Sequence, residues 1–259
     1  MTDLLLTDID DRGVCTLALN RPDVFNAFND TLIAELFTSF SWIAEQAHIR
    51  AVVLTGTGSC FSAGADLTWM RQAASLSYAE NERDAERLSS MLAMVDACPK
   101  PTVALVRGGA FGGGVGLVAC CDMTVATPDA KFALSEVRLG LTPATISPYV
   151  IARIGQGAAR RLFLTAERIS AAEARRLGLI SEVAEDAEAA VEAMVDALLA
   201  GAPGAQAEAK RLIFDIAGQP ITEELRADTA NRIAARRASQ EGKEGLTAFL
   251  EKRKPGWVA

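Results

Sequence analysis

The order of hydrophobic and polar residues along the chain predicts short strands and longer helices in alternation. Strand patterns are either a period-two alternation or a short run that is apolar throughout, and helix patterns place apolar residues on one face of a 3.6-residue period. The strand patterns cover Leu4–Ile9, Val14–Leu19, Ala51–Leu54, Thr102–Val106, Met123–Ala126 and Leu179–Val183. The helix patterns run from Asn29 or Asp30 to about Ala47, and over Ala79–Ala97, Gly112–Cys120, Ala171–Leu177 and Ala187–Leu199.

This alternation predicts an α/β core with parallel strand pairing after an N-terminal hairpin. The turn Asp11-Arg12-Gly13 closes the hairpin, and Gly201-Ala202-Pro203-Gly204 ends the alternation. Beyond that break we expect only helices, near Ala205–Ala217, Thr222–Ser239 and Lys243–Lys252. We therefore expect a core over residues 1–200 and a helical region over 201–259 that packs on the core or on another subunit.

Composition narrows the classes of function. Half of the 259 residues are hydrophobic, the formal net charge is −7, and the chain has one histidine, His48. The charge gives no general attraction to nucleic acid or to an anionic membrane. A single histidine argues against a Ser-His-Asp triad and a histidine-rich zinc site. The five cysteines have no C-x-x-C spacing, and the sequence has no signal-peptide pattern or long apolar run, so we expect a cytoplasmic location and no bound metal.

Glycines are densest between a predicted strand and a predicted helix, over Gly108–Gly116. They allow a close backbone approach, and the free N–H groups of the first helical turn would point at a ligand. Close helix packing is the alternative. The spacing of Gly114, Gly116 and Ala119 also fits a dinucleotide-binding loop, but the next strand ends at Ala126 without an acidic residue for the ribose.

A second small-residue turn, Phe61–Leu67, follows another strand of the same predicted sheet. Two such turns would allow two backbone N–H groups to face one oxygen, which is what an oxyanion hole requires. Glu136 lies in the apolar stretch Phe132–Gly140, where burial would raise its pKa and suit it to acid–base work. The alternative is a surface glutamate paired with Arg138 or bonded to Ser135.

Together these segments resemble the crotonase family, also called the enoyl-CoA hydratase/isomerase superfamily. The resemblance covers nearly the whole chain, and its motifs occur in the family's order. They are Leu19-Asn20-Arg21-Pro22 with Asn26-Ala27, Ala63-Gly64-Ala65-Asp66, Gly112-Gly113-Gly114 with Cys121-Asp122, Phe132–Gly140, Ala171–Ile180 and the ending Phe249–Pro255.

The resemblance implies a spiral of ββα units, a C-terminal helical trimerisation region, and an acyl-CoA thioester as substrate, with coenzyme A as part of that substrate and no other cofactor. The partner would be a second copy of the chain, as a homotrimer or a dimer of trimers. The implied catalytic groups are the Glu136 side chain and the N–H groups of Ala65 and Gly113. The implied substrate-binding residues are Phe25, Ala27, Ala63, Ala65, Asp66, Leu67, Thr68, Gly113 and Gly116.

Two features depart from the family's pattern. Gly116 stands where typical hydratases carry the first of two glutamates, and Pro143–Pro148 replaces a glycine-rich stretch. Both are similar to the bacterial methylglutaconyl-CoA hydratase group of leucine and isoprenoid catabolism. The resemblance thus implies an enoyl-CoA hydratase. A Δ3,Δ2-enoyl-CoA isomerase and a non-catalytic acyl-CoA-binding subunit are the alternatives. A carboxylate on the acyl group would require a basic partner, for which Arg71, Arg138 and Arg153 are the candidates.

Overall fold

The computed structural model describes residues 3–258. Its strands are β1 (Leu5–Ile9), β2 (Val14–Leu19), β3 (Ala51–Gly56), β4 (Thr102–Val106), β5 (Gly109–Phe111), β6 (Met123–Ala126), β7 (Lys131–Ala133), β8 (Ile169–Ser170) and β9 (Glu182–Val183). Its α-helices are α1 (Asp30–Glu45), α2 (Leu67–Ala73), α3 (Tyr78–Asp96), α4 (Gly113–Cys120), α5 (Ser147–Thr165), α6 (Ala171–Leu177), α7 (Ala187–Leu199), α8 (Pro203–Ile216), α9 (Glu223–Ala238) and α10 (Gln240–Leu250). Two short 3₁₀ helices are η1 (Pro22–Val24) and η2 (Glu136–Leu139).

The strands form two sheets. The larger has the order β1-β2-β3-β4-β6-β9, and the smaller has the order β5-β7-β8. Only β1–β2 is antiparallel in the larger sheet, and the smaller sheet pairs β5 with β7 in parallel. Two isolated bridges, Phe28–Ala65 and Ser62–Ala110, join the loop after β3 to neighbouring segments. The glycine-rich turn before α4 and the turn before α2 therefore meet beside the smaller sheet.

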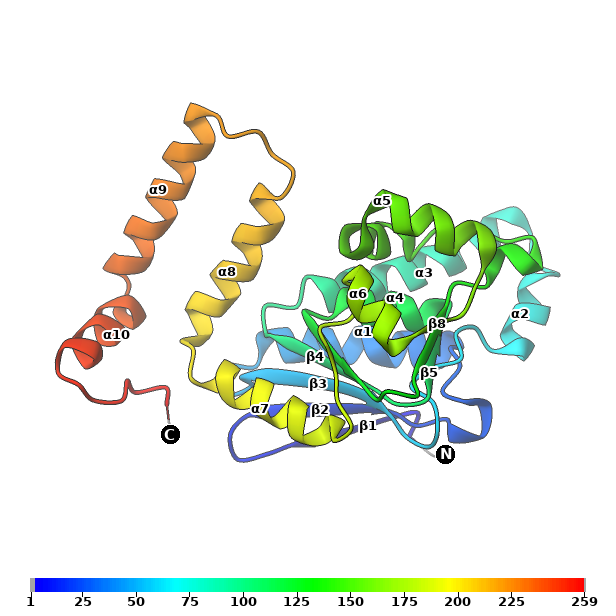
Figure 1. Ribbon diagram of the computed structural model, residues 1–259, viewed down its shortest axis with the longest axis horizontal. Helices are drawn as coiled ribbons and strands as arrows, with labels where there is room; N and C mark the ends of the chain where they lie inside the picture. The colour runs from blue at the N-terminus through cyan, green and yellow to red at the C-terminus, as the bar shows by residue number, and fades with distance from the viewer. Residues whose placement is uncertain (1–2, 259) are drawn as a thin grey trace.

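Helices cover both faces of the larger sheet (Figure 1). On one face, α1, α3 and α4 pack into the main apolar core, which includes Phe28, Leu92 and Ile146. On the other face, α7 packs on Val53 and Val103 in a second, smaller core. Residues Ala51–Leu54 of β3 are buried, as a short run that is apolar throughout predicts, and β4 is buried along its whole length.

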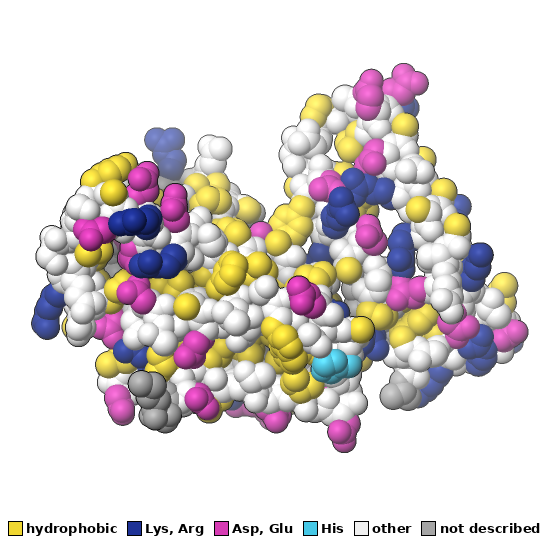
Figure 2. All heavy atoms as spheres, turned by 180° about the vertical axis from the view of Figure 1, so that it is seen from behind, with side chains coloured by type: hydrophobic (Ala, Val, Ile, Leu, Met, Phe, Trp, Pro, Cys, Tyr) yellow, Lys and Arg dark blue, Asp and Glu magenta, His cyan; other side chains and the backbone are white. Residues whose placement is uncertain are grey.

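The C-terminal helices stand apart from the core in Figure 1. Two basic residues attach them to it. Lys210 of α8 contacts the Asp122 carboxylate at 2.7 Å. The Arg50 guanidinium donates to the carbonyls of Leu199, Gly201 and Trp257, so it holds both the start of this region and the segment near its end. Figure 2 shows apolar side chains on the outside of these helices, and the strongly exposed ones are Ile213, Phe214, Ile221, Ile233, Leu246, Phe249 and Leu250.

Most predicted elements are present within a few residues of the expected bounds, and α4, α6, α7, β4 and β6 match closely. The predicted strand over Leu179–Val183 is wrong in its first half: the N–H groups of Leu179 and Ile180 bond to the Ala174 carbonyl at the end of α6. In the described part of the chain, no helix is long and apolar enough to cross a membrane.

The sequence pattern did not predict α5. It carries Pro148 in its first turn and Gly155 at a non-helical φ of 71°, so its apolar period is interrupted. Strands β5, β7 and β8 were also missed, because two or three residues are too few to establish an alternation.

Candidate active site

Two turns predicted to carry backbone donors lie against each other. A Cβ placed on Gly64 would lie 2.7 Å from the Phe111 carbonyl oxygen and 3.6 Å from Cα of Gly112. A Cβ on Gly114 would lie 2.8 Å from the Ser62 carbonyl oxygen. These approaches exclude larger residues, since such short Cβ contacts would force the two backbones apart. The glycines therefore bring the segment before α2 to the N-terminus of α4.

The N–H groups of Ala65 and Gly113 are free at this junction. Phe28 donates to the Gly64 carbonyl and accepts from Asp66, so the Ala65 N–H points away from that bridge. Gly113 is the first residue of α4, where a helix leaves its N–H without an internal acceptor. Within residues 3–258, neither group has a hydrogen-bond acceptor. Two unpaired donors on adjoining turns form a candidate oxyanion hole.

Local packing fixes the start of α4. A Cβ on Gly113 would lie 2.8 Å from a ring carbon of Phe28, and Gly112 has a φ of 49°, in the region that favours glycine. The rest of α4 is buried from Gly114 onward. The partial positive charge of its N-terminus therefore acts in a poorly solvated place, where it favours a developing negative charge.

The Glu136 carboxyl group lies against this same turn. A Cβ on Gly112 would lie 3.1 Å from Oε1 of Glu136. Oε2 is buried and has no hydrogen-bond partner in the described structure. Burial raises the pKa of Glu136, opposed by a hydrogen bond from its own backbone. This direction agrees with the prediction made from the apolar sequence around it.

Neither of the two structural alternatives for Glu136, an ion pair with Arg138 or a hydrogen bond with Ser135, is present among the described residues. In the part of the chain that the structure describes, no ion pair joins it to Arg138, whose side chain is exposed. Ser135 makes no side-chain hydrogen bond at the start of η2. The carboxyl group is thus held by its surroundings rather than by a charged partner.

Gly116 is covered by a side chain. A Cβ placed on it would overlap Cγ2 of Ile146 and would lie 3.0 Å from Cβ of Ile146 and 3.6 Å from a methyl group of Leu92. Ile146 is almost completely buried, at 2% exposure. The position at which the resemblance places a first glutamate is therefore filled by an isoleucine from the loop that also departs from the family pattern.

The residues predicted to bind the CoA portion differ in their exposure. Phe25, Leu67 and Thr68 are exposed, Ala63 is half-buried and Ala27 is buried. Asp66 has a structural role in addition: it accepts from the N–H groups of Thr68 and Trp69 at the start of α2 and pairs with Arg21 at 2.8 Å. These bonds lower the pKa of Asp66 despite its burial.

A pocket of about 530 Å³ opens beside Phe25 and Ala63. It has two arginines in its lining, Arg138 and Arg168, and the Arg168 guanidinium lies 5.3 Å from the centre of the Phe111 ring. Sequence reasoning missed Arg168, because it stands in a connecting segment far along the chain. Two cations beside the predicted CoA-binding residues provide a place for an anionic group.

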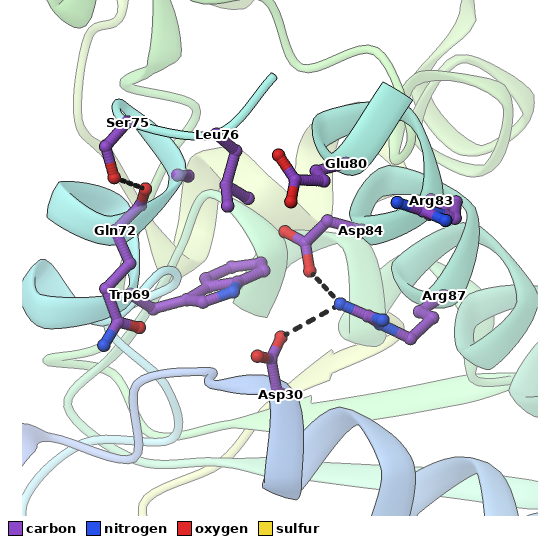
Figure 3. A pocket seen from close by; sticks show the side chains of 10 residues that line it. Asp30, Trp69, Gln72, Ser75, Leu76, Glu80, Arg83, Asp84 and Arg87 are labelled. Carbon is purple, nitrogen blue, oxygen red and sulfur yellow. Dashed lines mark hydrogen bonds and ion pairs between the residues drawn. The ribbon is translucent and has the colours of Figure 1, made fainter. Parts of the chain in front are cut away.

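A separate pocket of about 620 Å³ lies between α2, α3 and the start of α1 (Figure 3). Trp69 points into it, and Arg87 pairs with Asp84 at 2.8 Å and with Asp30 at 3.6 Å. Glu136 is not among its lining residues. We call this the charged pocket, since its polar groups are largely paired with one another.

Other residues considered at the sequence level have structural places. His48 is exposed, and Cys120 and Cys121 are buried in the core, as predicted. Arg153 donates to the carbonyls of Ala119, Cys121 and Asp122, so it closes the C-terminal end of α4 and is not available to a substrate carboxylate. Among residues 3–258, no group of three His, Cys, Asp or Glu side chains is arranged to hold a metal ion.

Comparison with known proteins gives consistent matches over the whole chain. The family profile described as enoyl-CoA hydratase/isomerase matches residues 10–259. The crotonyl-CoA hydratase of Syntrophomonas wolfei is 32% identical over 254 residues, with 95% of each chain covered. An enoyl-CoA hydratase structure from Shewanella pealeana superposes with a TM-score of 0.96 at 42% identity, covering 98% of this chain and 96% of that one. One from Mycobacterium smegmatis gives 0.92 at 38%, covering 98% and 99%. The expected α/β fold with C-terminal helices is confirmed.

Proposed function

Because the chain belongs to the enoyl-CoA hydratase/isomerase family, we propose that it adds water to a 2-enoyl-CoA thioester with Glu136 as the acid–base residue. The N–H groups of Ala65 and Gly113 would hold the thioester oxygen. Enoyl-CoA hydratases among its relatives support the reaction class. The roles of these three residues rest on the geometry of the junction.

One observation carries the proposal: Gly112 lies next to both the backbone N–H donors and the Glu136 carboxyl group. Its Cα lies beside Gly64, next to the free N–H of Ala65, and its own Cβ position lies 3.1 Å from Oε1 of Glu136. A thioester oxygen bound by the two N–H groups would thus place C2 and C3 of the acyl group near the carboxyl. Donors and acid–base group meet without a histidine or a metal ion.

The steps balance with one carboxylate. Glu136 takes a proton from water as the water oxygen bonds to C3, and the electrons of the C2–C3 double bond move to the thioester oxygen. The two N–H groups and the α4 N-terminus stabilise this enolate. When the enolate collapses, Glu136 returns the proton to C2 and is again ionised. The product is a 3-hydroxyacyl-CoA.

The test is hydration of crotonyl-CoA by wild-type protein and by Glu136→Gln. The amide keeps the shape of the side chain but cannot take a proton, so kcat should fall by about 10²- to 10⁴-fold. Binding of a saturated acyl-CoA, measured by calorimetry, should stay within about twofold because the amide fills the same space. Unchanged turnover by Glu136→Gln would refute the assignment. Binding without turnover by the wild type would instead favour a non-catalytic acyl-CoA-binding subunit.

A Δ3,Δ2-enoyl-CoA isomerase is the second candidate, and the cover over Gly116 favours it. A single carboxyl between apolar walls suffices to move a proton from C2 to C4, and that reaction uses no water. Incubation with 2-hexenoyl-CoA and, separately, with 3-hexenoyl-CoA in ¹⁸O-labelled water separates the two. A hydratase places the label in the 3-hydroxyl group formed from 2-hexenoyl-CoA and leaves 3-hexenoyl-CoA unchanged, whereas an isomerase converts 3-hexenoyl-CoA into unlabelled 2-hexenoyl-CoA.

For the acyl group, we propose a short chain, with 3-methylglutaconyl-CoA as the specific candidate. Ile146 and Leu92 limit the space above Gly116. The distal carboxylate of that substrate needs a cation, and of the three candidates Arg153 is occupied by carbonyl groups while Arg138 lines the 530 Å³ pocket. A substrate panel with product identification tests this choice. Faster turnover of long, unbranched enoyl-CoA esters would contradict it.

We also propose that residues 201–259 form the oligomerisation region of a trimer or a dimer of trimers. Support comes from the exposed apolar side chains of α8 to α10 (Figure 2). Sedimentation equilibrium should give a multiple of three chains, and a monomer at micromolar concentration would contradict the proposal. A cytoplasmic location fits the five free, buried cysteines, and fractionation of cells that express the protein checks it.

A further inference from the structure

Two side chains lie against the start of α4, over backbone positions one turn apart. The Gly116 N–H donates to the Gly112 carbonyl at 3.2 Å, which is the spacing of one helical turn. The Glu136 carboxyl lies beside the Cβ position of Gly112, and the Ile146 side chain lies over Gly116. One turn of helix rises about 5.4 Å, so the two side chains cover neighbouring parts of the α4 backbone. The short helix η2, which begins at Glu136, also packs on α5, which begins next to Ile146.

We propose that Ile146 is a positioning residue for Glu136: it excludes water from one flank of the carboxyl group and fills the space that a second carboxylate would need. The consequence for catalysis rests on the proposed function, because it assumes that Glu136 transfers protons to and from an enoyl-CoA. The packing of Ile146 over Gly116 does not depend on that function. Both parts are open to separate tests.

The local sequence gives an independent reason to assign Ile146 a role. Ile146 is the N-cap of α5, and it makes no capping hydrogen bond. Ser, Thr, Asp and Asn are favoured at this position, and replacing one of them by an apolar residue costs about 1 kcal/mol. The chain gives up that stabilisation and buries the side chain over α4 instead. A departure from local preference of this kind is expected where another requirement decides the residue.

The electrostatic surroundings of Glu136 agree with a carboxyl group from which water is excluded on one side. The nearby elements carry titratable groups, namely Tyr149 and Arg153 on α5, Cys120 on α4, Cys121 at the C-cap of α4 and Arg138 on η2. None of these, nor any other charged side chain described, contributes to the raised pKa of Glu136, for which burial is the cause. The carboxyl is therefore governed by how much water reaches it, which is what a neighbouring alkyl side chain controls.

The first experiment compares Ile146→Val with Ile146→Thr. Valine and threonine have nearly the same shape, but threonine adds a hydroxyl group beside the carboxyl. The titration of Glu136 is followed by ¹³C NMR of glutamate-labelled protein, with Glu136→Gln identifying the signal. We expect the valine variant to titrate like wild type and the threonine variant to titrate lower by about half a pH unit or more.

The pH profile of hydration provides the matching kinetic test. The acidic limb of kcat/KM should move in the threonine variant by the same amount as the NMR titration and should stay in place in the valine variant. If both variants lose rate equally with neither limb nor titration moved, Ile146 has only a packing role and the proposal is overturned. A wild type without turnover would contradict the proposed function instead, and the NMR comparison would still decide the role of Ile146.

The second experiment tests whether Ile146 fills the space at Gly116. Gly116→Ala should lower the melting temperature strongly in wild type, because its Cβ overlaps the isoleucine methyl group. The same change made together with Ile146→Gly should cost much less, since glycine removes both clashing carbons and is an acceptable N-cap. An equal cost of Gly116→Ala in the two backgrounds would show that the space is not set by Ile146.

Discussion

The protein treats its partly buried carboxyl groups in opposite ways at two places. In the charged pocket, Asp30 and Asp84 share the Arg87 guanidinium (Figure 3). At the junction of the two glycine turns, Glu136 has no charged partner, and one of its oxygens has no hydrogen bond. In the first arrangement a cation lies between two carboxyl groups, whereas the second leaves one carboxyl without a charged partner.

The pKa direction alone does not separate the two places. Burial raises the pKa of Asp30, and nearby Asp84 raises it further, although Arg87 opposes both. Burial alone raises the pKa of Glu136. What distinguishes Glu136 is the pair of free backbone donors beside it, since an acid–base group needs a place for the charge that develops on the substrate. The charged pocket is therefore the weaker candidate for catalysis.

After Glu136→Gln, the largest expected effect on the rate comes from Gly112→Ala. The added Cβ would press on Oε1 of Glu136 and would strain a residue at a φ of 49°. A misplacement of about 1 Å at a reacting group costs on the order of 10²-fold in rate, so kcat/KM for hydration should fall by about that factor.

Gly218→Ala is the matched control for Gly112→Ala. Gly218 also has a positive φ, 75°, but its Cβ would meet open space. Gly218→Ala should lose about 1 kcal/mol of stability from backbone strain and Gly112→Ala more, because its ψ of −118° lies outside the left-handed helical region; only Gly112→Ala should lose activity. Equal rates for the two variants would show that Gly112 does not position the carboxyl.

The second prediction concerns pH and stability. A carboxyl whose pKa is raised by folding binds its proton more tightly in the folded state, so it opposes folding when ionised and ceases to do so as the pH falls. Glu136→Gln should therefore melt a few degrees above wild type at pH 7.5, with the gap closing as the pH drops through the folded-state pKa. The gain for Asp30→Asn should be smaller, because that change also removes a partner of Arg87. Thermal melts at pH 4 to 8 measure both, and a gap for Glu136→Gln that widens on acidification would contradict the sign.

The smallest effect is expected for Arg87→Met in the charged pocket. Without the guanidinium, Asp30 and Asp84 repel each other, but the arginine and Asp30 are both more than half exposed, so the loss should be below about 1 kcal/mol. It should shrink at 0.5 M salt, and hydration should stay within about twofold of wild type. A tenfold loss of hydration would show that the charged pocket communicates with the Glu136 site.

Much of the fold was predictable because its elements are long or carry clear end signals. Asn29 caps α1 and accepts from the Leu32 N–H, and Gly112 precedes α4 as the glycine cluster predicted. The helix α5 was not predictable, since Gly155 interrupts its period. Its absence from the predicted elements mattered, because α5 begins at the residue that covers Gly116.

The site was predictable in its parts and not in its contacts. The apolar sequence around Glu136 indicated a raised pKa, and the two small-residue turns indicated backbone donors. The overlap of Gly116 with Ile146 joins residues thirty positions apart, on elements that no periodicity relates. Whether two such segments lie close together is known only from the folded chain. The sequence thus suggested an empty space at the place of the first glutamate, whereas in the structure the Ile146 side chain fills that space.

The Arg50 guanidinium has a further consequence for the end of the chain. It binds carbonyls at Leu199 and Gly201 and again at Trp257, whose indole N–H donates to Ala200. The last three helices therefore belong to a loop whose two ends are held together by the Arg50 side chain. Lengthening such a loop costs little free energy, so a short insertion between α8 and α9 should leave the Arg50 hydrogen bonds intact. Removing the residues after 254 would remove the hydrogen bond between Arg50 and Trp257, and limited proteolysis near Gly201 would report the difference.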